Sequence, residues 1–332
     1  MKVLVLGGAG YIGSHFVKSI MSSKHDVVVV DNLSTGHKQS LPKNIKFYQA
    51  DVRDFTFLDQ VFTDEKIDAC VHFCANSLVA ESMQDPLKYF DNNVIGAIRL
   101  LQIMVKHKTK YIVFSSSAAV YGLHKDMPIT EEYQTLPTNP YGETKLIMEK
   151  IFKWSEQAYG IKYVSLRYFN VAGASSDSSI GEDHNPETHL IPIVLQVPLG
   201  KREFLTVFGD DYQTPDGTCV RDYIHVEDLV DAHIKALEYL EKTNESNVFN
   251  LGSQSGYSNL EILKSAISVT KRDIPVKIGS RRPGDPDVLI ASNKKAKDVL
   301  NWEVKNDIKD IISSAWEFYL KHPLGYQEER ND

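Results

Sequence analysis

The chain has 332 residues, of which 42% are hydrophobic and 24% are charged, and its formal net charge is −7. These values are ordinary for a globular protein with one large domain or two smaller ones, and the negative charge argues against a general attraction to nucleic acid. Because no apolar run approaches the ~18 residues that a membrane-spanning helix needs, we expect no membrane partner.

The first predicted strand, Val3–Leu6, leads directly into a glycine-rich turn and then a predicted helix. The turn contains Gly7, Gly8, Gly10 and Gly13, which fit both Gly-x-Gly-x-x-Gly and Gly-x-x-Gly-x-x-Gly spacing. Glycines let the backbone turn tightly and approach a pyrophosphate, while the helix N-terminus offers unpaired N–H groups to the phosphate oxygens. The pattern therefore predicts a dinucleotide-binding turn.

An acidic residue, Asp31, ends the second predicted strand, Val27–Val30. It follows Gly13 at close to the ~20-residue spacing expected of a carboxylate that binds the hydroxyls of the adenosine ribose. Because this carboxylate would repel a 2′-phosphate and no arginine stands beside it, the sequence favours NAD over NADP. Asp51, after the predicted strand Ile45–Tyr48, is either a ligand of the adenine amino group or a solvated turn residue.

The following strands are predicted from apolar runs that are continuous rather than alternating, as in strands covered on both faces. These runs are Ala69–Phe73, Tyr111–Phe114 and Tyr163–Leu166, and a long amphipathic helix is predicted at Leu87–His107. Strands that alternate with helices indicate a Rossmann-type, doubly wound parallel sheet, an α/β fold. We expect this NAD-binding domain to occupy residues 1–173.

Tyr141 and Lys145 are four residues apart and share one face of a helix if this segment is helical. Asn139 is a good helix cap, and Pro140 suits the first helical position. A positive charge close to a phenol favours the phenolate, so Lys145 is expected to lower the pKa of Tyr141 and make it a usable base. Taken alone, the pair is more typical of an exposed tyrosine and lysine on an ordinary helix.

A serine run that ends in Ser117 follows the fifth predicted strand. Ligands of open parallel sheets bind beyond the carboxyl ends of the strands, so this run is expected to face the nicotinamide. Oxidation of a carbinol requires these three side chains together: Tyr141 to remove the hydroxyl proton, Ser117 to hydrogen-bond the same oxygen, and Lys145 to hold the ribose.

Beyond Gly173 the strand–helix alternation breaks, and residues 174–187 are interpreted as a polar surface loop. A helix from about His189 and a strand at Phe204–Phe208 follow, and Ser258 begins a capping box that opens another helix. We expect a smaller α/β C-terminal domain over residues 174–332 that binds the substrate. Val248–Leu251 is predicted to be a buried strand that could return to the first domain.

The chain has three cysteines, Cys70, Cys74 and Cys219, and no cluster of cysteine and histidine has the spacing of a zinc site. We therefore expect no metal. An odd number of cysteines without paired spacing argues against a disulfide framework and favours the cytoplasm.

Together these motifs resemble the extended short-chain dehydrogenase/reductase family, and within it the enzymes that invert C4 of a UDP-hexose. The resemblance extends from Met1 to about Pro323, and the motifs of the second half are the more discriminating ones. The matching segments are Gly7–Gly13, Asp31–Leu33, Phe114–Gly122, Pro140–Lys145, Arg167–Asn170 with Gly173, Asp216–Thr218, Val220–Val226 and Arg281–Asp285.

The resemblance implies an isomerase that interconverts UDP-glucose and UDP-galactose with tightly bound NAD. Hydride leaves C4 of the sugar, the 4-keto sugar rotates about its link to the diphosphate, and the hydride returns to the other face, so that NAD is regenerated in each cycle. It also implies a homodimer, because the helix at Leu87–His107 and the one starting at Tyr141 resemble those that pair in the family's dimers.

Single positions of this sequence take their expected roles from the same resemblance. Arg221, Arg282 and Asn170 match ligands of the diphosphate, while Phe208 and Asp285 match residues that hold the uracil and its ribose. The other positions expected to contact substrate are Ser117, Tyr141, His189, Leu190 and Leu289. The positions expected to contact NAD are Gly7, Gly10, Tyr11, Ile12, Gly13, Asp31, Asn32, Leu33, Ser34, Thr35, Gly36, Asp51, Val52, Phe73, Ser77, Asn93, Tyr141, Lys145 and Phe169.

Three positions depart from the family pattern. Ser77 stands where many members have a lysine near the nicotinamide ribose, so NAD could be held differently there. His189 replaces an asparagine that contacts the substrate and can still donate a hydrogen bond. Leu289 lies where a tyrosine narrows the sugar pocket in some relatives and a smaller residue admits an N-acetyl group in others, which leaves UDP-GlcNAc and UDP-GalNAc open as additional substrates.

Two alternative functions are considered. A sugar-nucleotide 4,6-dehydratase or a decarboxylase has the same fold, but a dehydratase carries an Asp-Glu pair where this chain has Ala118 and Ala119, which cannot titrate. A non-catalytic NAD-sensing regulator is a different class of protein and would not need Ser117, Tyr141 and Lys145 together.

Overall fold

The computed structural model describes residues 1–282 and 285–326, and its largest element is a parallel sheet of seven strands. Their order across the sheet is β10–β6–β5–β4–β1–β2–β3, so the chain starts in the middle and winds outward in both directions. The strands are β1 (Lys2–Leu6), β2 (Asp26–Asp31), β3 (Lys46–Gln49), β4 (Ala69–His72), β5 (Tyr111–Ser117), β6 (Lys162–Tyr168) and β10 (Asn247–Leu251).

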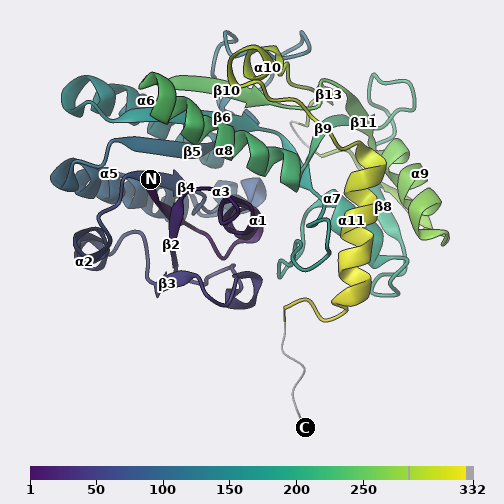
Figure 1. Ribbon diagram of the computed structural model, residues 1–332. Coiled ribbons are helices and arrows are strands. Elements are labelled where there is room, and N and C mark those ends of the chain that lie inside the picture. The colour runs from purple at the N-terminus through teal and green to yellow at the C-terminus, as the bar shows by residue number, and fades with distance from the viewer. Residues whose placement is uncertain (283–284, 327–332) are drawn as a thin grey trace.

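Helices cover both faces of this sheet, which confirms the predicted doubly wound α/β fold (Figure 1). On one face, α1 (Tyr11–Ile20) and α8 (Val226–Thr243) enclose a core that includes Val5, Phe16 and Leu237. On the other face lie α2 (Phe55–Glu65), α5 (Gly96–His107) and α6 (Pro140–Tyr159). The strands are apolar on both faces because each face is buried under helices.

The second half of the chain builds smaller sheets beside this one. One sheet has the order β11–β9–β13, with β7 paired to β9, and another pairs β12 with β8. Figure 1 shows α9 and α11 at the opposite end of the molecule from α5. The elements are β7 (Asn170–Ala172), α7 (Leu190–Gln196), β8 (Leu205–Phe208), β9 (Val220–His225), β11 (Gly256–Ser258), α9 (Asn259–Thr270), β12 (Val276–Gly279), β13 (Val288–Leu289), α10 (Lys294–Leu300) and α11 (Ile308–Lys321).

The chain returns to the large sheet after residue 173. β10 pairs in parallel with β6, and α8 packs on the same face as α1, so both belong spatially to the NAD-binding half. Val248–Leu251 is thus part of the seven-stranded sheet. A division at residue 173, with 174–332 as a separate substrate domain, remains a prediction, and residues 327–332 of that range lie outside the described part of the chain.

The predicted helix at Leu87–His107 forms as three connected pieces. α4 (Pro86–Tyr89) follows α3 (Val79–Gln84), a π-helical turn spans Phe90–Ile95, and α5 completes the run. The π-turn contains Asn93, whose side chain is buried. Such turns widen the helix locally and often occur at functional sites.

A buried network joins β5, β6, α6 and β10 at their carboxyl-terminal side. Arg167 on β6 donates from Nε to Glu149 Oε1 of α6 at 2.9 Å, and the Ser116 hydroxyl of β5 donates to the same oxygen at 2.5 Å. The Arg167 guanidinium also donates to the Tyr121 hydroxyl at 2.8 Å, which in turn donates to Asn250 of β10 at 2.6 Å. The ion pair and its hydrogen bonds satisfy these groups away from water and fix α6 against the sheet.

In the described residues, 1–282 and 285–326, no helix has both the length and the apolar character needed to cross a membrane.

Candidate functional site

The turn between β1 and α1 is a backbone cradle that tolerates no side chain at two of its positions. Gly7 has a φ of +78°, and a Cβ there would lie 2.5 Å from the Cys74 nitrogen. A Cβ at Gly13 would lie 2.1 Å from the Gly7 carbonyl oxygen. A Cβ at Gly10, by contrast, would lie 3.4 Å from that oxygen and meet no other heavy atom closely. The bare backbone at Gly10, at the N-terminus of α1, fits the pyrophosphate of a dinucleotide.

Asp31 is held at the end of β2, beside this turn. One carboxylate oxygen accepts from the Ala9 N–H at 2.9 Å and the other from the Leu33 N–H at 2.8 Å. Burial raises the pKa of Asp31 above its ordinary value, and these N–H groups partly offset the rise. The Asp31 carboxylate is thus hydrogen-bonded to the glycine turn, beside which it is expected to bind the adenosine ribose.

The loop after β2 folds back onto the same turn. Gly36 packs against it, since a Cβ at Gly36 would lie 2.8 Å from the Ala9 oxygen. The Asn32 amide donates to Asp51 at 3.0 Å, and Arg53 also binds Asp51, which lowers the pKa of that carboxyl. The loop therefore brings together the expected NAD contacts Asn32, Leu33, Ser34, Thr35, Gly36, Asp51 and Val52.

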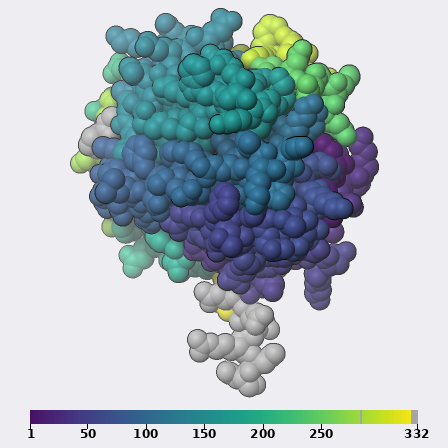
Figure 2. All heavy atoms as spheres, turned by 90° about the vertical axis from the view of Figure 1, so that its left-hand side faces the viewer, coloured from purple at the N-terminus to yellow at the C-terminus, as the bar shows by residue number. Residues whose placement is uncertain are grey.

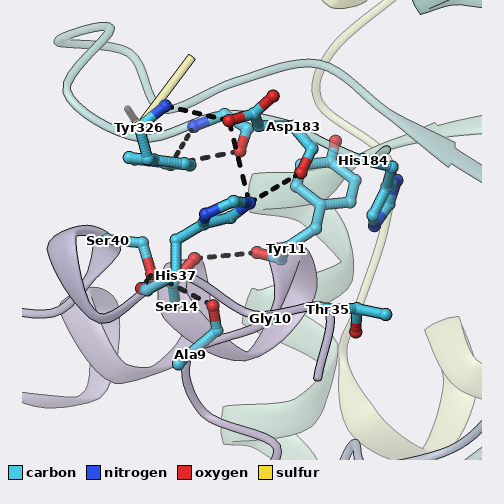
Figure 3. A pocket seen from close by; sticks show the side chains of 11 residues that line it. Ala9, Gly10, Tyr11, Ser14, Thr35, His37, Ser40, Asp183, His184 and Tyr326 are labelled. Atoms are coloured by element: carbon cyan, nitrogen blue, oxygen red, sulfur yellow. Dashed lines mark hydrogen bonds and ion pairs between the residues drawn. The ribbon is translucent and has the colours of Figure 1, made fainter. Parts of the chain in front are cut away.

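A small pocket opens directly beside the glycine turn (Figure 3). Ala9, Gly10 and Ser14 line one side, and Asp183 and Tyr326 line the other. His37 Nε2 lies 2.9 Å from the Asp183 carbonyl oxygen, so the loop after β2 contacts the segment before α7. Tyr11 faces the same region but donates its hydroxyl to the Gly173 carbonyl at 2.7 Å.

Two expected NAD contacts, Asn93 and Ser77, lie on or beside the segment after β4. Asn93 is tied to the Asn76 backbone in both directions, at 2.8 and 3.0 Å, and donates to the Thr144 hydroxyl at 3.1 Å. It therefore supports the segment after β4 and the start of α6. Ser77 is exposed in that segment and adds no positive charge.

Two aromatic residues flank the same edge of the sheet. Phe73 follows β4 and packs against Phe16, with 5.4 Å between the ring centroids. Phe169 lies between β6 and β7 and is partly buried, as is Ile12 in the first turn of α1.

Ser117, Tyr141 and Lys145 come together at the carboxyl end of β5. The Asn139 side chain caps α6 by accepting from the Gly142 N–H at 2.9 Å, and Pro140 occupies the first turn, as predicted. Lys145 is buried and donates to the Ser115 carbonyl at 2.8 Å, and its ammonium lies 5.7 Å from the centroid of the Tyr141 ring. The pair is therefore not an exposed surface feature.

The pKa of Tyr141 is shifted in the opposite direction to the one expected from the sequence. Burial raises the pKa of Tyr141 above its ordinary value, and only the hydrogen bond with the Ser117 hydroxyl opposes the rise. Burial likewise lowers the pKa of Lys145 to about 8. The expected lowering of the Tyr141 pKa by Lys145 is thus wrong for this structure, because the ammonium is directed to a carbonyl and ring faces while desolvation dominates.

The expected substrate contacts gather on the second-half sheets. Arg221 on β9 donates to Asp285 at 2.5 Å, and the Arg282 guanidinium lies 4.5 Å from the centroid of the Phe208 ring. Leu289 is aligned with Arg221 across the β13–β9 pair.

Two links connect these residues to the catalytic group. Leu289 packs against the cluster that contains Tyr121 and Leu146, and Leu146 follows Lys145 on α6. Asn170 begins β7, two residues after Tyr168, and Tyr168 is aligned with Ser117 across the β5–β6 pair. The side-chain amide of Asn170 donates to the Asp222 carbonyl at 3.0 Å. The residues expected to bind the nucleotide and those expected to be catalytic therefore lie on adjoining elements.

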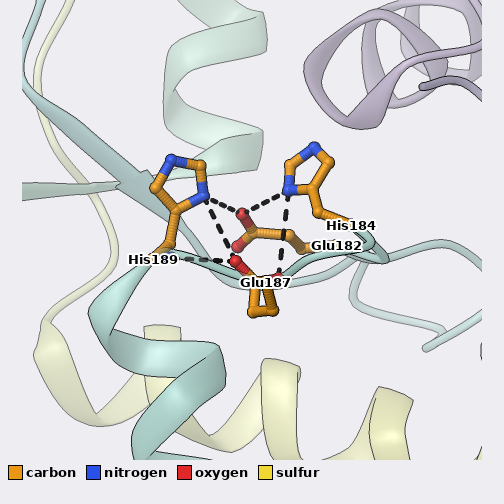
Figure 4. A group of neighbouring side chains, drawn as sticks. All are labelled: Glu182, His184, Glu187 and His189. Atoms are coloured by element: carbon orange, nitrogen blue, oxygen red, sulfur yellow. Dashed lines mark hydrogen bonds and ion pairs between the residues drawn. The ribbon is translucent and has the colours of Figure 1, made fainter. Parts of the chain in front are cut away.

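One side-chain cluster was missed by the sequence analysis. Glu182, His184, Glu187 and His189 converge in the loop before α7, with their nearest ligand atoms all within 4.8 Å of one another (Figure 4). Burial opposes the charge of His189, but the Glu182 carboxylate outweighs this effect and raises the pKa of His189 to about 9. The alternating Glu-x-His-x-x-Glu-x-His pattern was the available signal, and it was overlooked because the search for metal ligands was limited to cysteine and histidine.

Comparison with known proteins places this site in context. Residues 3–252 match the model of the NAD dependent epimerase/dehydratase family. The chain is 58% identical to a UDP-glucose 4-epimerase of Lacticaseibacillus casei over 327 residues, covering 98% of this chain and 99% of the relative.

Two solved structures are also similar. A crystal structure of a UDP-glucose 4-epimerase has a TM-score of 0.97 at 52% identity, covering 99% of this chain and 100% of that one. The UDP-glucose 4-epimerase of Bifidobacterium longum in complex with NAD+ and UDP has a TM-score of 0.93 at 40% identity, covering 98% and 100%.

The glycine turn yields a prediction that separates binding from folding. Gly10→Ala is expected to keep the thermal midpoint of the NAD-free protein within about 2 °C while reducing the affinity for NAD at least about tenfold, because the new methyl group meets the ligand and not the protein. Gly13→Ala is expected to lower both the thermal midpoint and the affinity for NAD, since its Cβ would overlap the Gly7 carbonyl. Differential scanning calorimetry and titration with NAD would measure the two effects. Equal NAD affinity of Gly10→Ala and the wild type would contradict the assignment.

Proposed function

Because the chain belongs to the NAD dependent epimerase/dehydratase family, we propose that it is an NAD-dependent isomerase that interconverts UDP-glucose and UDP-galactose. The observation that carries this function is the convergence of Ser117, Tyr141 and Lys145 beside a dinucleotide turn. The near full-length similarity to UDP-glucose 4-epimerases identifies the carbinol as C4 of a UDP-hexose.

The protein's own side chains take up and return the proton of a single group, the C4 hydroxyl of the sugar. Bound NAD supplies an acceptor for the hydride of C4 and later its return. Tyr141 removes the proton from the C4 hydroxyl and gives it back after the sugar has turned, while Ser117 hydrogen-bonds the same oxygen. Lys145 would hold the nicotinamide ribose, and its ammonium, which donates to the Ser115 carbonyl at 2.8 Å, lies beside the Tyr141 ring. The raised pKa of Tyr141 suits its return step, because the phenol readily takes a proton back.

The NAD-binding residues are proposed to be those that surround the glycine turn. Backbone N–H groups at the start of α1 would bind the pyrophosphate, and Asp31 would bind the adenosine ribose. Asn32–Gly36 follow β2, Asp51 and Val52 follow β3, Phe73 follows β4 and Phe169 follows β6, so all are at the carboxyl-terminal edge of the sheet.

The nucleotide of the substrate is proposed to lie on the second half. Arg221 and Arg282 would bind the diphosphate, because guanidinium groups match phosphate oxygens, and Asn170 would add a hydrogen bond. Phe208 and Asp285 would hold the uracil and its ribose, and His189 and Leu190 lie at the start of α7. Arg221 and Asp285 already form an ion pair, so the diphosphate would share the positive charge of Arg221 with a carboxylate.

Dehydration is disfavoured by the residues after β5. Ala118 and Ala119 begin the short helix there, so neither position can supply the additional acid or base that removal of a C5 proton requires.

We also propose that the protein is a homodimer and that it is located in the cytoplasm. Figure 2 shows the face to which α5 and α6 contribute, and apolar side chains are exposed on the helices of this region. They include Leu87, which is 77% exposed, and Trp154, which is 68% exposed. Such residues are typical of an interface. The three free cysteines favour a reducing compartment.

The role of Tyr141 is tested by removing only its hydroxyl. Tyr141→Phe is expected to retain bound NAD and UDP-galactose affinity but lose at least about 100-fold in kcat, because proton transfer loses its carrier. Tyr159→Phe, on the same helix and 64% exposed, is the matched control and should have wild-type kcat. A kcat for Tyr141→Phe within a factor of about two of the wild type would refute the role.

The sugar range is tested at Leu289, where we propose that the pocket also admits an N-acetyl group. Leu289→Tyr is expected to lower kcat/KM for UDP-GalNAc at least about tenfold relative to UDP-galactose, because the larger side chain fills the space. Val288→Ile is the control, since neighbouring residues of a strand face opposite sides. No turnover of UDP-GalNAc by the wild type, under conditions that convert UDP-galactose, would rule out the broader range.

The dimer is tested by sedimentation. The wild type is expected to sediment as a dimer at micromolar concentration, and Leu87→Glu combined with Trp154→Glu should shift it to monomers, because buried unpaired charges are costly. Lys24→Glu, at a site remote from α5 and α6, serves as the control. A monomeric wild type would dispose of the homodimer.

A further inference from the structure

The loop before α7 holds two carboxylates and two imidazoles that face one another. Figure 4 shows that the Nδ1 atoms of both histidine rings point toward the carboxylates and that the Nε2 atoms point away. His184 Nδ1 lies 3.1 Å from Glu182 Oε1 and 3.9 Å from Glu187 Oε2. His189 Nδ1 lies 3.7 Å from Glu187 Oε1 and also contacts Glu182.

We propose that Glu182, His184, Glu187 and His189 form a zinc-binding site. Zinc ligands at the usual distances of about 2.0–2.2 Å in a tetrahedron are separated from one another by about 3.3 Å. Three of the four histidine–carboxylate pairs, at 3.1 to 3.9 Å between ligand atoms, lie around this value, and the fourth, between His189 and Glu182, is in closer contact. Small rotations of the side chains would therefore place all four groups on one ion.

The chemistry of the four ligands favours zinc over harder cations. Calcium and magnesium prefer oxygen ligands alone, whereas a mixed set of two imidazole nitrogens and two carboxylate oxygens suits zinc. The side chains of Glu182 and Glu187 are only 3% and 6% exposed, so their two negative charges need compensation inside the protein. A single divalent cation would supply it.

The surrounding contacts hold the ligands in place without the ion. Glu187 Oε1 accepts from the N–H groups of Thr188 and His189 at 2.7 and 2.8 Å, which fixes the carboxylate against its own loop. The His184 ring meets the edge of Tyr11, at the start of α1, with 6.3 Å between centroids. Such support of the ligands is typical of metal sites.

Zinc would fix the loop before α7 at the candidate active site. His184 of the cluster contacts Tyr11, in the first turn of α1, and His189 directly precedes α7. An ion on the Nδ1 atom of His189 would keep the proton on Nε2 and so make this nitrogen a hydrogen-bond donor. That consequence rests on the proposed function, in which His189 contacts the substrate, whereas the metal site itself does not.

Metal content provides the direct test, on the full chain without a histidine tag. After incubation with zinc chloride and gel filtration, we expect plasma mass spectrometry to find one zinc ion per wild-type chain. His184→Ala and Glu187→Gln are each expected to reduce the bound zinc at least about tenfold. His124→Ala, which removes a partly buried histidine outside the cluster that hydrogen-bonds the Gln134 carbonyl and packs against Tyr133, is the matched control and should retain the ion.

A second readout does not depend on the variants. Chelation should lower the thermal midpoint of the wild type and zinc, but not magnesium, should restore it, because a ligand that binds only the folded state stabilises that state. Cobalt should give the visible absorption of a tetrahedral ion in the wild type and not in His184→Ala. Absence of bound zinc in the wild type would overturn the site and identify the cluster as protonated ion pairs. Unchanged zinc content in both ligand variants would overturn it as well.

Discussion

The buried ion pair between Arg167 and Glu149 is the interaction on which the candidate active site depends. It joins β6 to α6, and the Ser116 hydroxyl and Tyr121 extend it to β5 and β10. Glu149 lies one helical turn beyond Lys145, while Ser116 precedes Ser117. The same network that satisfies a buried charge therefore fixes the helix that carries Tyr141 and the strand that carries Ser117, so that stability and alignment have one physical source.

Burial has opposite consequences at the two ends of this site. Around the glycine turn, close packing leaves no room for side chains, so the backbone N–H groups at the start of α1 are available to an anion. Around Tyr141 and Lys145 it disfavours charge, raising the pKa of the phenol and lowering that of the ammonium. The phenol of Tyr141 is thus protonated in the ligand-free protein. A positive charge that arrives with a bound ligand would lower its pKa and so favour loss of the proton.

The strands of the large sheet and the start of α6 were predictable because their signals are local. Continuous apolar runs placed all seven strands of the large sheet, and Asn139 with Pro140 marked the start of α6. The short strands β7, β9, β11 and β13 were not predicted, since each is stabilised by pairing with distant residues more than by its own pattern. Asn93 was assigned to NAD by family resemblance, and only the structure shows that it hydrogen-bonds Asn76 and Thr144.

Spacing along the chain was sufficient for the dinucleotide turn and the Tyr141–Lys145 pair, because a turn and a helix fix the geometry of residues a few positions apart. Distances between remote segments depended on tertiary packing. The return of β10 to the sheet and the approach of Arg221 to Asp285 arise from contacts that no local pattern encodes. The same packing removed Lys145 and Tyr141 from water, so their pKa values followed desolvation and not their spacing in the sequence.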